Sequence, residues 1–305
     1  MVGVISTANH AKLLWPGIKE LWGMSYDELS QQWSKVLEKG TSDKSYEELQ
    51  EITGFGLAAV KPEGTAISYD SHSQGVTTTL RNVTYGLGFI VTEEEGDDNK
   101  YKQVGTFRAR ALGFSMRQSK EIVAANLINR GFLSAYPGGD GKELFATDHP
   151  TNGGGAQSNE LNPAADLSEA ALETMLIQIS NAKNSRGMRI GLKGQKLVVP
   201  PELQFDAERI VNSTLRPGSA NNDVNAMKSM GLLPDGVFVW QYLDQGDDFF
   251  IKTNLPTGGG MLLQRKEASI KKDNDFDTAN DKNKSTERYV VGYGDWRWAY
   301  GSLGL

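Results

Sequence analysis

The 305-residue sequence contains no cysteine, which excludes disulfide scaffolds, cysteine-ligated zinc and thiol nucleophiles. Histidine is scarce, and His10, His72 and His149 are scattered along the chain without the helical spacing of a zinc site. His149 lies between Asp148 and Pro150, so we interpret it as a structural turn residue rather than a ligand. We therefore predict no metal and no cofactor, and we expect packing or subunit association to supply stability.

Long apolar runs are also absent. No stretch reaches the roughly 18 residues of a membrane span, and residues 1–22 lack the basic start and cleavage site of a secretory signal. The 38 acidic residues outnumber the 32 basic ones, and the net charge of -6 argues against nucleic-acid binding by the chain as a whole. We expect a protein that is made in the cytoplasm and has no membrane partner.

The motifs of common enzymes fail at identifiable positions. A P-loop would need glycine at Tyr136 and serine or threonine at Glu143, and a dinucleotide fingerprint would need its third glycine at Val91. No constellation of residues singles out a catalytic acid and base. We predict no enzymatic activity, with an unidentified enzyme as the less favoured alternative.

Residues 273–277 begin like a calcium-binding loop, because oxygen-bearing side chains alternate there. The rest of the loop does not follow, since Thr278 replaces the glycine and Lys284 replaces the glutamate that such a loop requires. We interpret this segment as a solvated loop rather than a calcium site, because a polar run such as residues 273–287 is ordinarily surface.

The most informative segment that is present covers residues 92–130, where an acidic run at 93–98 precedes a basic, helix-like segment. Seven basic residues between positions 100 and 130 accompany the single acid Glu121. Apolar residues recur at helical spacing, at Val104, Phe107, Ala111, Phe114, Ile122, Val123 and Leu127. A helix over residues 100–130 would be roughly 45 Å long and could serve as a structural beam.

The first sixty residues predict two short helices. Ser25–Glu28 and Ser45–Glu48 each place a serine three residues before a glutamate, as in a capping box, and Gly40 and Gly54 are placed to end the helices. Helices of about ten residues are marginal alone. They form either a helical layer of the same domain or an arm that reaches a neighbouring subunit.

Residues 61–92 change to strand periodicity. Residues 65–70 and 76–85 are rich in β-branched and aromatic side chains and flank a turn-like stretch at 71–75, which predicts an extended hairpin. Such a hairpin cannot make a core of its own, because its faces are polar. We expect it to contact a partner through Ile67, Tyr69, His72, Thr78, Leu80 and Arg81.

The second half of the chain alternates helices and strands, as in a mixed α+β domain. The predicted elements are a helix starting at 166–169, a strand at 196–200, a helix at 203–214, paired strands at 237–243 and 249–251, and a strand-rich segment at 288–300.

Several segments follow one another in a recognisable order: Tyr85–Thr92, Asp98-Asn99, Asn126–Phe132, Asp140-Gly141, Leu144–Pro150, Lys196–Pro201, Asn221-Asn222 and Asp295–Arg297. This series resembles the major capsid proteins of tailed double-stranded DNA bacteriophages, particularly the Mu-like head subunits. The resemblance covers residues 60–305.

The resemblance implies the Hong Kong 97-type capsid fold, of α+β class. The implied parts are an N-terminal arm (1–60), an extended β-hairpin loop (61–92), a peripheral domain with a long spine helix (93–165), an inserted axial domain (166–264) and a return to the peripheral domain (265–305). Residues 288–300 would then rejoin the peripheral sheet.

The implied function is that of a structural major capsid protein, located in the virion, which self-assembles into an icosahedral head enclosing double-stranded DNA. The implied partners are copies of itself in hexamers and pentamers, a separate scaffolding protein, a portal, and DNA held by weak non-specific contact. The alternative is another oligomeric phage protein, such as a tail tube or decoration protein. Some family members crosslink their hairpins through lysine, but no lysine occurs between Pro62 and Val91, so we predict an uncrosslinked shell.

The basic residues Arg108, Arg110, Arg117 and Lys120 have two interpretations. They could make salt-sensitive contacts with DNA phosphates, or they could pair with acidic residues of the arm or of a neighbour's hairpin. We favour pairing between subunits, because a shell must release its DNA.

Overall fold

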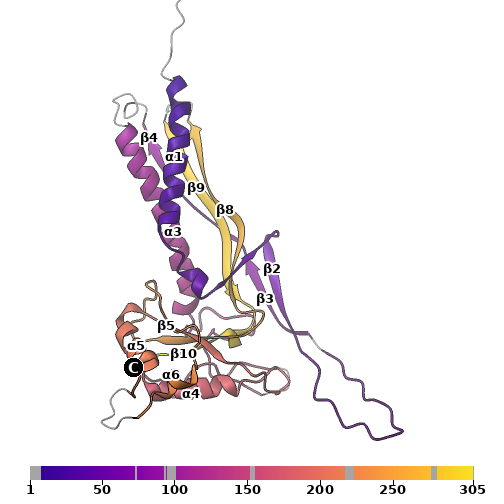
Figure 1. Cartoon of the computed structure of the whole chain (residues 1–305). Coiled ribbons are helices and arrows are strands. Elements are labelled where there is room, and N and C mark those ends of the chain that lie inside the picture. The colour runs from indigo at the N-terminus through magenta and orange to yellow at the C-terminus, as the bar shows by residue number, and fades with distance from the viewer. Residues whose placement is uncertain are drawn as a thin grey trace, which may run out of the picture.

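The molecule has three parts: an elongated half, a compact lobe, and a hairpin that leaves the junction between them (Figure 1). The computed structural model describes residues 8–72, 74–92, 94, 101–151, 155–216, 223–275 and 280–304. The acidic run at 93–98 lies outside these residues apart from Glu94, as do Asn221 and Asn222.

The elongated half consists of two long helices packed along a four-stranded sheet of order β1-β8-β9-β4. The predicted basic helix is confirmed as α3, Tyr101–Asn129, and it runs beside α1, Ala8–Glu28. The strands are β1 (Glu38–Thr41), β4 (Val83–Val91), β8 (Gly260–Asn274) and β9 (Asp281–Tyr293).

A small apolar core joins α1 to α3 and the sheet. Its buried members are Ile18, Trp22, Ala109, Leu112, Met116 and Ile270. Gly113 allows the helices to approach closely, because a Cβ at this position would lie 2.6 Å from the carbonyl oxygen of Trp22. The sequence left two alternatives for the first sixty residues, a helical layer of the same domain or an arm that reaches a neighbour. For α1 the first holds, because this helix packs on α3 of its own subunit.

The other helix predictions for this region are wrong. Ser25–Glu28 lies at the end of α1 rather than at a helix start, and the chain continues through the short 3-10 helix η1, Trp33–Lys35. Residues 46–52 form strand β2 (Tyr46–Ile52), which pairs antiparallel with β3 (Gln74–Arg81). Cross-strand pairing outweighed the capping box, because seven residues are too few for a self-supporting helix.

The hairpin also differs from its prediction. Its strands are β2 and β3. Residues 53–72 connect them and are called here the tip loop. The chain reverses direction at Glu63-Gly64, where Gly64 has φ 80°. Residues 65–70, all within the described range, are extended but form no strand, whereas 83–91 is β4 of the elongated half. Asn82 separates β3 from β4, because its side-chain Nδ2 donates to Ser42 Oγ (2.7 Å) and to the Lys44 carbonyl (2.9 Å).

The compact lobe surrounds a second sheet of order β10-β7-β5-β6. Its strands are β5 (Gly194–Val199), β6 (Val237–Val239), β7 (Phe249–Thr253) and β10 (Ala299–Ser302), and its helices are α4 (Glu169–Ser180), α5 (Gln204–Asn212) and α6 (Ala226–Met230), with η2 (Pro201–Leu203) before α5. The predicted helix start is confirmed, because Ser168 caps α4 by accepting a hydrogen bond from the Ala171 N–H (3.2 Å). The strand and helix predicted at 196–200 and 203–214 are confirmed as β5 and α5.

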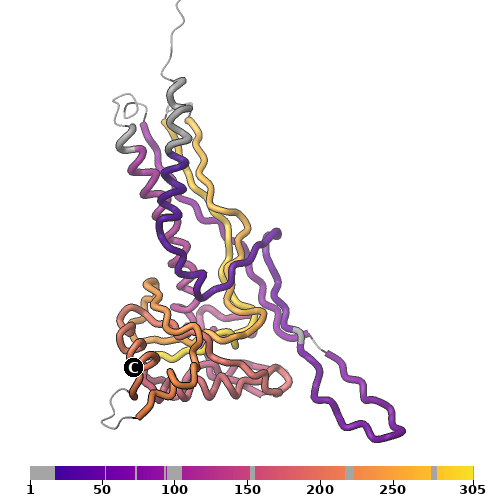
Figure 2. The backbone as a smooth tube through the Cα atoms, in the orientation of Figure 1, coloured from indigo at the N-terminus to yellow at the C-terminus, as the bar shows by residue number. Residues whose placement is uncertain are grey.

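Three predictions about the later strands are wrong. Strands β6 and β7 do not pair with each other, because both flank β5. Residues 273–287 are mostly paired strand, with 276–279 outside the described residues. The segment 288–300 divides, because β9 ends at Tyr293 and, after η3 (Trp296–Trp298), β10 joins the lobe sheet instead of the elongated one. Figure 2 shows this path of the chain from one half to the other.

Candidate assembly site at the hairpin and its base

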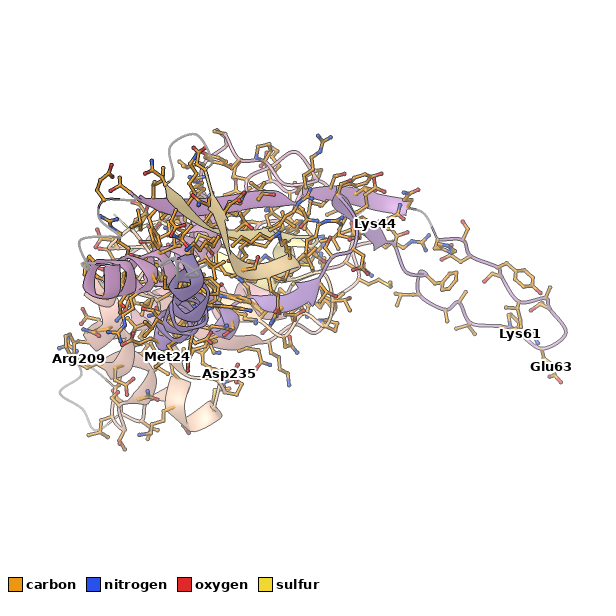
Figure 3. All side chains as sticks on the ribbon, turned by 90° about the horizontal axis from the view of Figure 1, so that it is seen from above. Met24, Lys44, Lys61, Glu63, Arg209 and Asp235 are labelled. Carbon is orange, nitrogen blue, oxygen red and sulfur yellow. The ribbon has the colours of Figure 1, made fainter. Side chains whose placement is uncertain are left out.

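The tip loop projects away from the body of the molecule. Seen from above, Lys61 and Glu63 lie at its far end (Figure 3). The loop exposes five large apolar side chains to between 61 and 95 % of their surface: Phe55, Leu57, Val60, Ile67 and Tyr69. Apolar groups gathered on a segment with no core beneath it mark a surface that another molecule covers.

The structure divides the six residues that the sequence assigned to hairpin contacts. Ile67, Tyr69 and His72 are exposed on the tip loop, and Arg81 is exposed on β3. Thr78 and Leu80 are buried within the subunit, where they occupy the space above Gly139 and Gly292. Burial removes Thr78 and Leu80 from the surface that a second molecule can contact.

One turn of the compact lobe, residues 183–188, holds the base of the hairpin from both sides. Ser185 Oγ donates to the Glu51 carboxylate on β2, while Arg186 donates to the Asp70 carboxylate and to the Ser71 carbonyl (2.6 Å). The Arg186 guanidinium lowers the pKa of Asp70 from 3.8 to about 2. Of the hairpin, both β2 and the returning arm of the tip loop are thus fixed to the lobe.

Arg297 extends this attachment towards the interior. Its guanidinium lies 3.6 Å from Glu51 and 3.0 Å from Asp295, and its Nε donates to the Lys183 carbonyl (2.9 Å). Burial raises the pKa of Asp295, although Arg297 opposes the shift. The guanidinium also lies over the Trp296 ring, 4.4 Å from its centroid.

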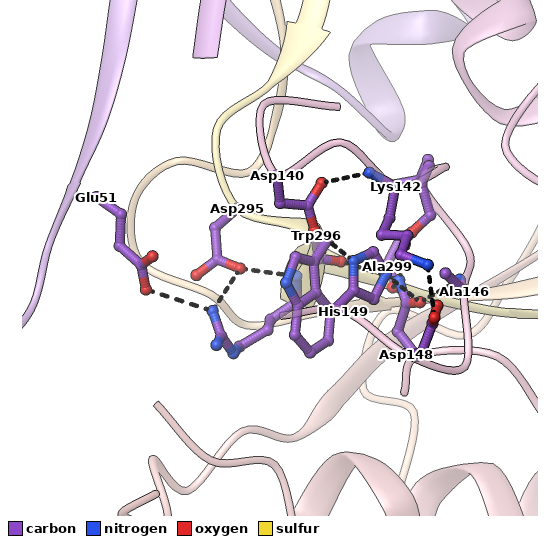
Figure 4. Close-up of polar contacts among 12 residues, drawn as sticks. Glu51, Asp140, Lys142, Ala146, Asp148, His149, Asp295, Trp296 and Ala299 are labelled. Carbon is purple, nitrogen blue, oxygen red and sulfur yellow. Dashed lines mark hydrogen bonds and ion pairs between the residues drawn. The ribbon is translucent and has the colours of Figure 1, made fainter. Parts of the chain in front are cut away.

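Beside Arg297 lies a buried polar cluster centred on His149 (Figure 4). The His149 ring is fully buried and stacks on Trp296 with centroids 4.2 Å apart. Its Nδ1 lies 2.6 Å from the Asp140 carboxylate, and its Nε2 lies 3.0 Å from Asn159 Oδ1. Every polar atom of the ring has a partner inside the subunit, which agrees with a structural role for His149.

Asn159 connects the same cluster to the lobe sheet. Its Nδ2 donates to the carbonyls of Leu144 (2.7 Å) and Ala299 (3.0 Å), and its Oδ1 accepts from the Ala146 N–H (3.0 Å). The sequence analysis missed Asn159, because a single asparagine in a loop carries no signal until its partners are known.

The four basic residues of α3 occupy different environments. Lys120 is buried, with Nζ 2.5 Å from Glu287 and 2.6 Å from Gln264, and burial lowers its pKa. Arg117 is buried as well and stacks on the Tyr26 ring at 5.0 Å. Both therefore bind their own chain, which corrects the prediction that they face DNA or another subunit. The charge pattern could not show this, because Glu287 is 167 residues away from Lys120.

Arg108 and Arg110 remain nearer the surface. Arg108 is half-buried and its Nη1 donates to the Ile90 carbonyl of β4 (3.1 Å), while Arg110 is exposed. Of the four, Arg110 is the residue that is best placed for an intermolecular contact.

Glu121 is a structural residue that the sequence analysis noted without assigning a role. Its carboxylate accepts hydrogen bonds from the backbone N–H groups of Gln32 (3.0 Å) and Trp33 (2.9 Å), where η1 begins. Burial raises the pKa of Glu121, and the two N–H donors act in the opposite direction. The sequence signal that could have indicated this role is that Glu121 is the one acidic residue within a basic helix.

Within the described ranges, no group of three histidine, aspartate or glutamate side chains is arranged to hold a metal ion. Among the helices that the structure describes, none combines the length and apolarity that crossing a bilayer requires.

A long helix on a long sheet, a compact α+β lobe and a projecting hairpin together define the Hong Kong 97-type capsid fold. Solved structures share this fold. One is a chain of Mycobacterium phage Patience, with 12 % sequence identity and a TM-score of 0.56, where the match covers 96 % of this chain and 88 % of that one. Another is the virus-like particle from Pyrococcus furiosus, with 10 % identity and a TM-score of 0.54, where the match covers 93 % of this chain and 97 % of that one. The procapsid of bacteriophage JBD30 is also similar, with 14 % identity and a TM-score of 0.52, and the match covers 98 % of this chain and 76 % of that one.

The phage capsid protein family model matches residues 75–302, so the chain belongs to the phage capsid protein family. It is a structural protein of a phage capsid. No curated protein matches its sequence.

Proposed function

We propose that this chain is the major capsid subunit, which assembles through hexamers and pentamers into an icosahedral head around double-stranded DNA. The observation that carries the proposal is the tip loop, whose Leu57, Val60 and Tyr69 are 86, 93 and 95 % exposed. Neighbouring subunits would bury these side chains, and burial of apolar surface stabilises association by about 25 cal/mol per Å². Membership of the phage capsid protein family supports the assignment.

Assembly in this proposal requires no chemical step. Each contact is of modest size, on the order of 1,600 Å², and contacts repeated around a closed lattice add to a stable shell. The turn at residues 183–188 sets the direction in which each hairpin leaves its subunit, because it fixes Glu51 and Asp70 to the lobe.

The other proposed partners are a separate scaffolding protein, a portal and packaged DNA. Arg110 supports a weak DNA contact, because it is exposed on α3 while Arg117 and Lys120 are buried. Synthesis in the host cytoplasm and final location in the virion complete the proposal.

Electron microscopy of the purified protein tests this function. We expect closed shells, whereas tubes would favour a tail protein and discrete small particles would contradict shell formation. A matched variant replaces residues 55–71 by a short glycine-serine turn, which keeps the β2–β3 ladder. This variant should fold with an unchanged circular dichroism spectrum and fail to form shells. Shells of normal size from the variant would show that the tip loop does not hold subunits together.

A further inference from the structure

Strand β4 forms an open edge of the elongated sheet. It pairs with β9 along its whole length, from Val83 to Val91, and stands last in the strand order. Among the described residues no strand pairs with its other side. A row of backbone N–H and C=O groups without ladder partners is a template for a further strand.

The contact of Arg108 identifies the backbone groups that face the open edge. Arg108 Nη1 donates a hydrogen bond to the Ile90 carbonyl, and this carbonyl therefore points away from β9. Backbone groups of successive residues in a strand point to alternate sides, so Thr84, Gly86 and Gly88 share the outward direction of Ile90. Arg108 covers one end of the edge and leaves the stretch from Thr84 to Gly88 open.

This edge lacks the devices that usually prevent strand addition. The sequence of β4, VTYGLGFIV, contains no charged residue and no proline. Val83, Leu87 and Ile90 are 49, 51 and 54 % exposed, and Thr84, Gly86 and Gly88 are exposed as well. Gly86 and Gly88 have no side chain that could cover the open edge, and the backbone that already lies close to them is β9, because a Cβ added at Gly88 would be 2.6 Å from the Asn283 carbonyl oxygen.

The same chain carries an unpaired segment that fits this edge. Residues 65–69, with the sequence TAISY, have the β-branched and aromatic composition of a strand and no charge. Among the described residues of the tip loop, segment 65–69 makes one backbone–backbone hydrogen bond, which the Thr65 N–H donates to the Pro62 carbonyl (3.3 Å). The two arms of the loop stand apart without a ladder between them (Figure 2).

The segment and the edge do not meet within one subunit. The tip loop extends away from the elongated half, and the views from the side and from above agree on this (Figures 1 and 3). A second copy of the chain supplies an open β4 edge for the tip-loop segment of the first copy. Every copy has one such segment and one such edge, so the two occur in equal number. Pairing would satisfy the unpaired backbone groups of both, and neither carries charges that oppose it.

We propose that residues 65–69 of one subunit add as a strand to the open edge of β4, at Thr84–Gly88, in a second copy of the chain. This inference rests on the proposed function and specifies the hairpin contact as main-chain hydrogen bonding. Ile67 and Tyr69 would then share one face of the added strand, because side chains two residues apart point the same way.

Disulfide trapping tests the pairing cleanly, because the natural chain has no cysteine to confuse the result. One protein carries Thr84→Cys, and a second set carries single cysteines at positions 65 to 69. The two are mixed, associated, oxidised and analysed on a denaturing gel without reductant. Facing residues of adjacent strands have Cβ atoms about 4.5–5.5 Å apart, close enough for a disulfide after small adjustments. Glu63→Cys, beyond the segment, is the matched control.

The expected result is a crosslinked dimer whose yield alternates along positions 65–69, with favoured positions at least about tenfold above their neighbours, because alternate side chains face opposite sides. Equal yields at all five positions would show contact without strand pairing and overturn the inference. It is also overturned if the associated protein gives no crosslink, or if β4 gains protection from hydrogen exchange only with a different phage protein. Closed shells that lack the crosslink would leave the proposed function standing, whereas loss of all association would remove both.

Discussion

At the scale of single residues, the subunit is held together by charges that the sequence places far apart. Lys120 of α3 meets Glu287 of β9 in the interior, where Gln264 Nε2 (2.9 Å) and Tyr26 Oη (3.1 Å) also donate to the Glu287 carboxylate. A buried ion pair adds little beyond an apolar pair of equal size, but loss of one partner leaves an uncompensated charge. The pair therefore makes the contact of α3 with the sheet sensitive to either residue.

Replacing Glu287 by glutamine tests this dependence. We expect Glu287→Gln to lower the free energy of unfolding by about 3–5 kcal/mol, because Lys120 would keep a buried charge without its counter-ion. Urea denaturation measures the change. The exposed Arg110→Gln on the same helix should stay within about 0.5 kcal/mol of the natural protein. Equal effects of the two substitutions would contradict the assignment.

Asp70 gives a prediction about pH. Its folded-state pKa is lowered from 3.8 to about 2, so its bond with Arg186 stabilises the hairpin base above pH 3.8 and is lost as the pH falls towards 2. Carbon NMR of the Asp70 carboxyl should give a midpoint near 2. The variant Arg186→Gln should move the midpoint back towards 3.8, while Arg189→Gln, an exposed arginine of the same segment, should not. A midpoint unaffected by Arg186→Gln would exclude the ion pair.

At the scale of elements, the α1–α3 interface depends on one glycine. A side chain at Gly113 would meet the backbone of α1, while Gly23 on α1 has no atom within 4 Å of an added Cβ. The two positions lie in the same pair of helices and differ in the space around them.

Alanine substitutions at these positions should act in opposite directions. Gly113→Ala should destabilise by about 1–3 kcal/mol, because the helices must separate. Gly23→Ala should stabilise by about 0.5–1 kcal/mol, because it removes the entropic disadvantage of glycine in a helix. Thermal unfolding followed by circular dichroism at 222 nm distinguishes them. Stabilisation by both would show that α1 does not pack on α3 at this distance.

Sequence reasoning succeeded for elements whose signals are long or locally complete. The basic helix has many turns of consistent periodicity, and Ser168 at the start of α4 acts on its own neighbours. It failed for β2, because Ser45–Glu48 has the pattern of a capping box and Tyr46, Leu49 and Ile52 recur at helical spacing. The pairing that makes this segment a strand comes from β3 across the hairpin. The clamp of Ser185 and Arg186 on the hairpin has no local signal at all, since its partners lie more than a hundred residues away.

At the scale of the whole molecule, the hairpin is the part that needs other subunits. Its tip loop carries one lysine, Lys61, at its far end, and the chain from Pro62 to Val91 has none. The lack of lysine over residues 62–91 predicts a shell that depends on non-covalent contacts, and Lys61 is the one hairpin-tip lysine through which a crosslink could form.

A denaturing gel of assembled particles checks this expectation. All of the protein should migrate as a single species of the subunit mass, 33.4 kDa. Boiling in detergent separates non-covalent contacts but not isopeptide bonds, so heating alone should dissolve the shell into monomers. A ladder of multimers that persists after boiling would contradict the prediction.

The position of β10 has a consequence for synthesis on the ribosome. Residues 299–302 complete the lobe sheet beside β7, and Gly301 bonds through its N–H to the Asn159 carbonyl (3.0 Å) and through its carbonyl to the Leu161 N–H (3.1 Å). A nascent chain has made its hairpin long before it has made these residues. Its lobe thus stays unfinished until translation passes position 302, and a polypeptide released earlier would lack the rigid base that aims the hairpin.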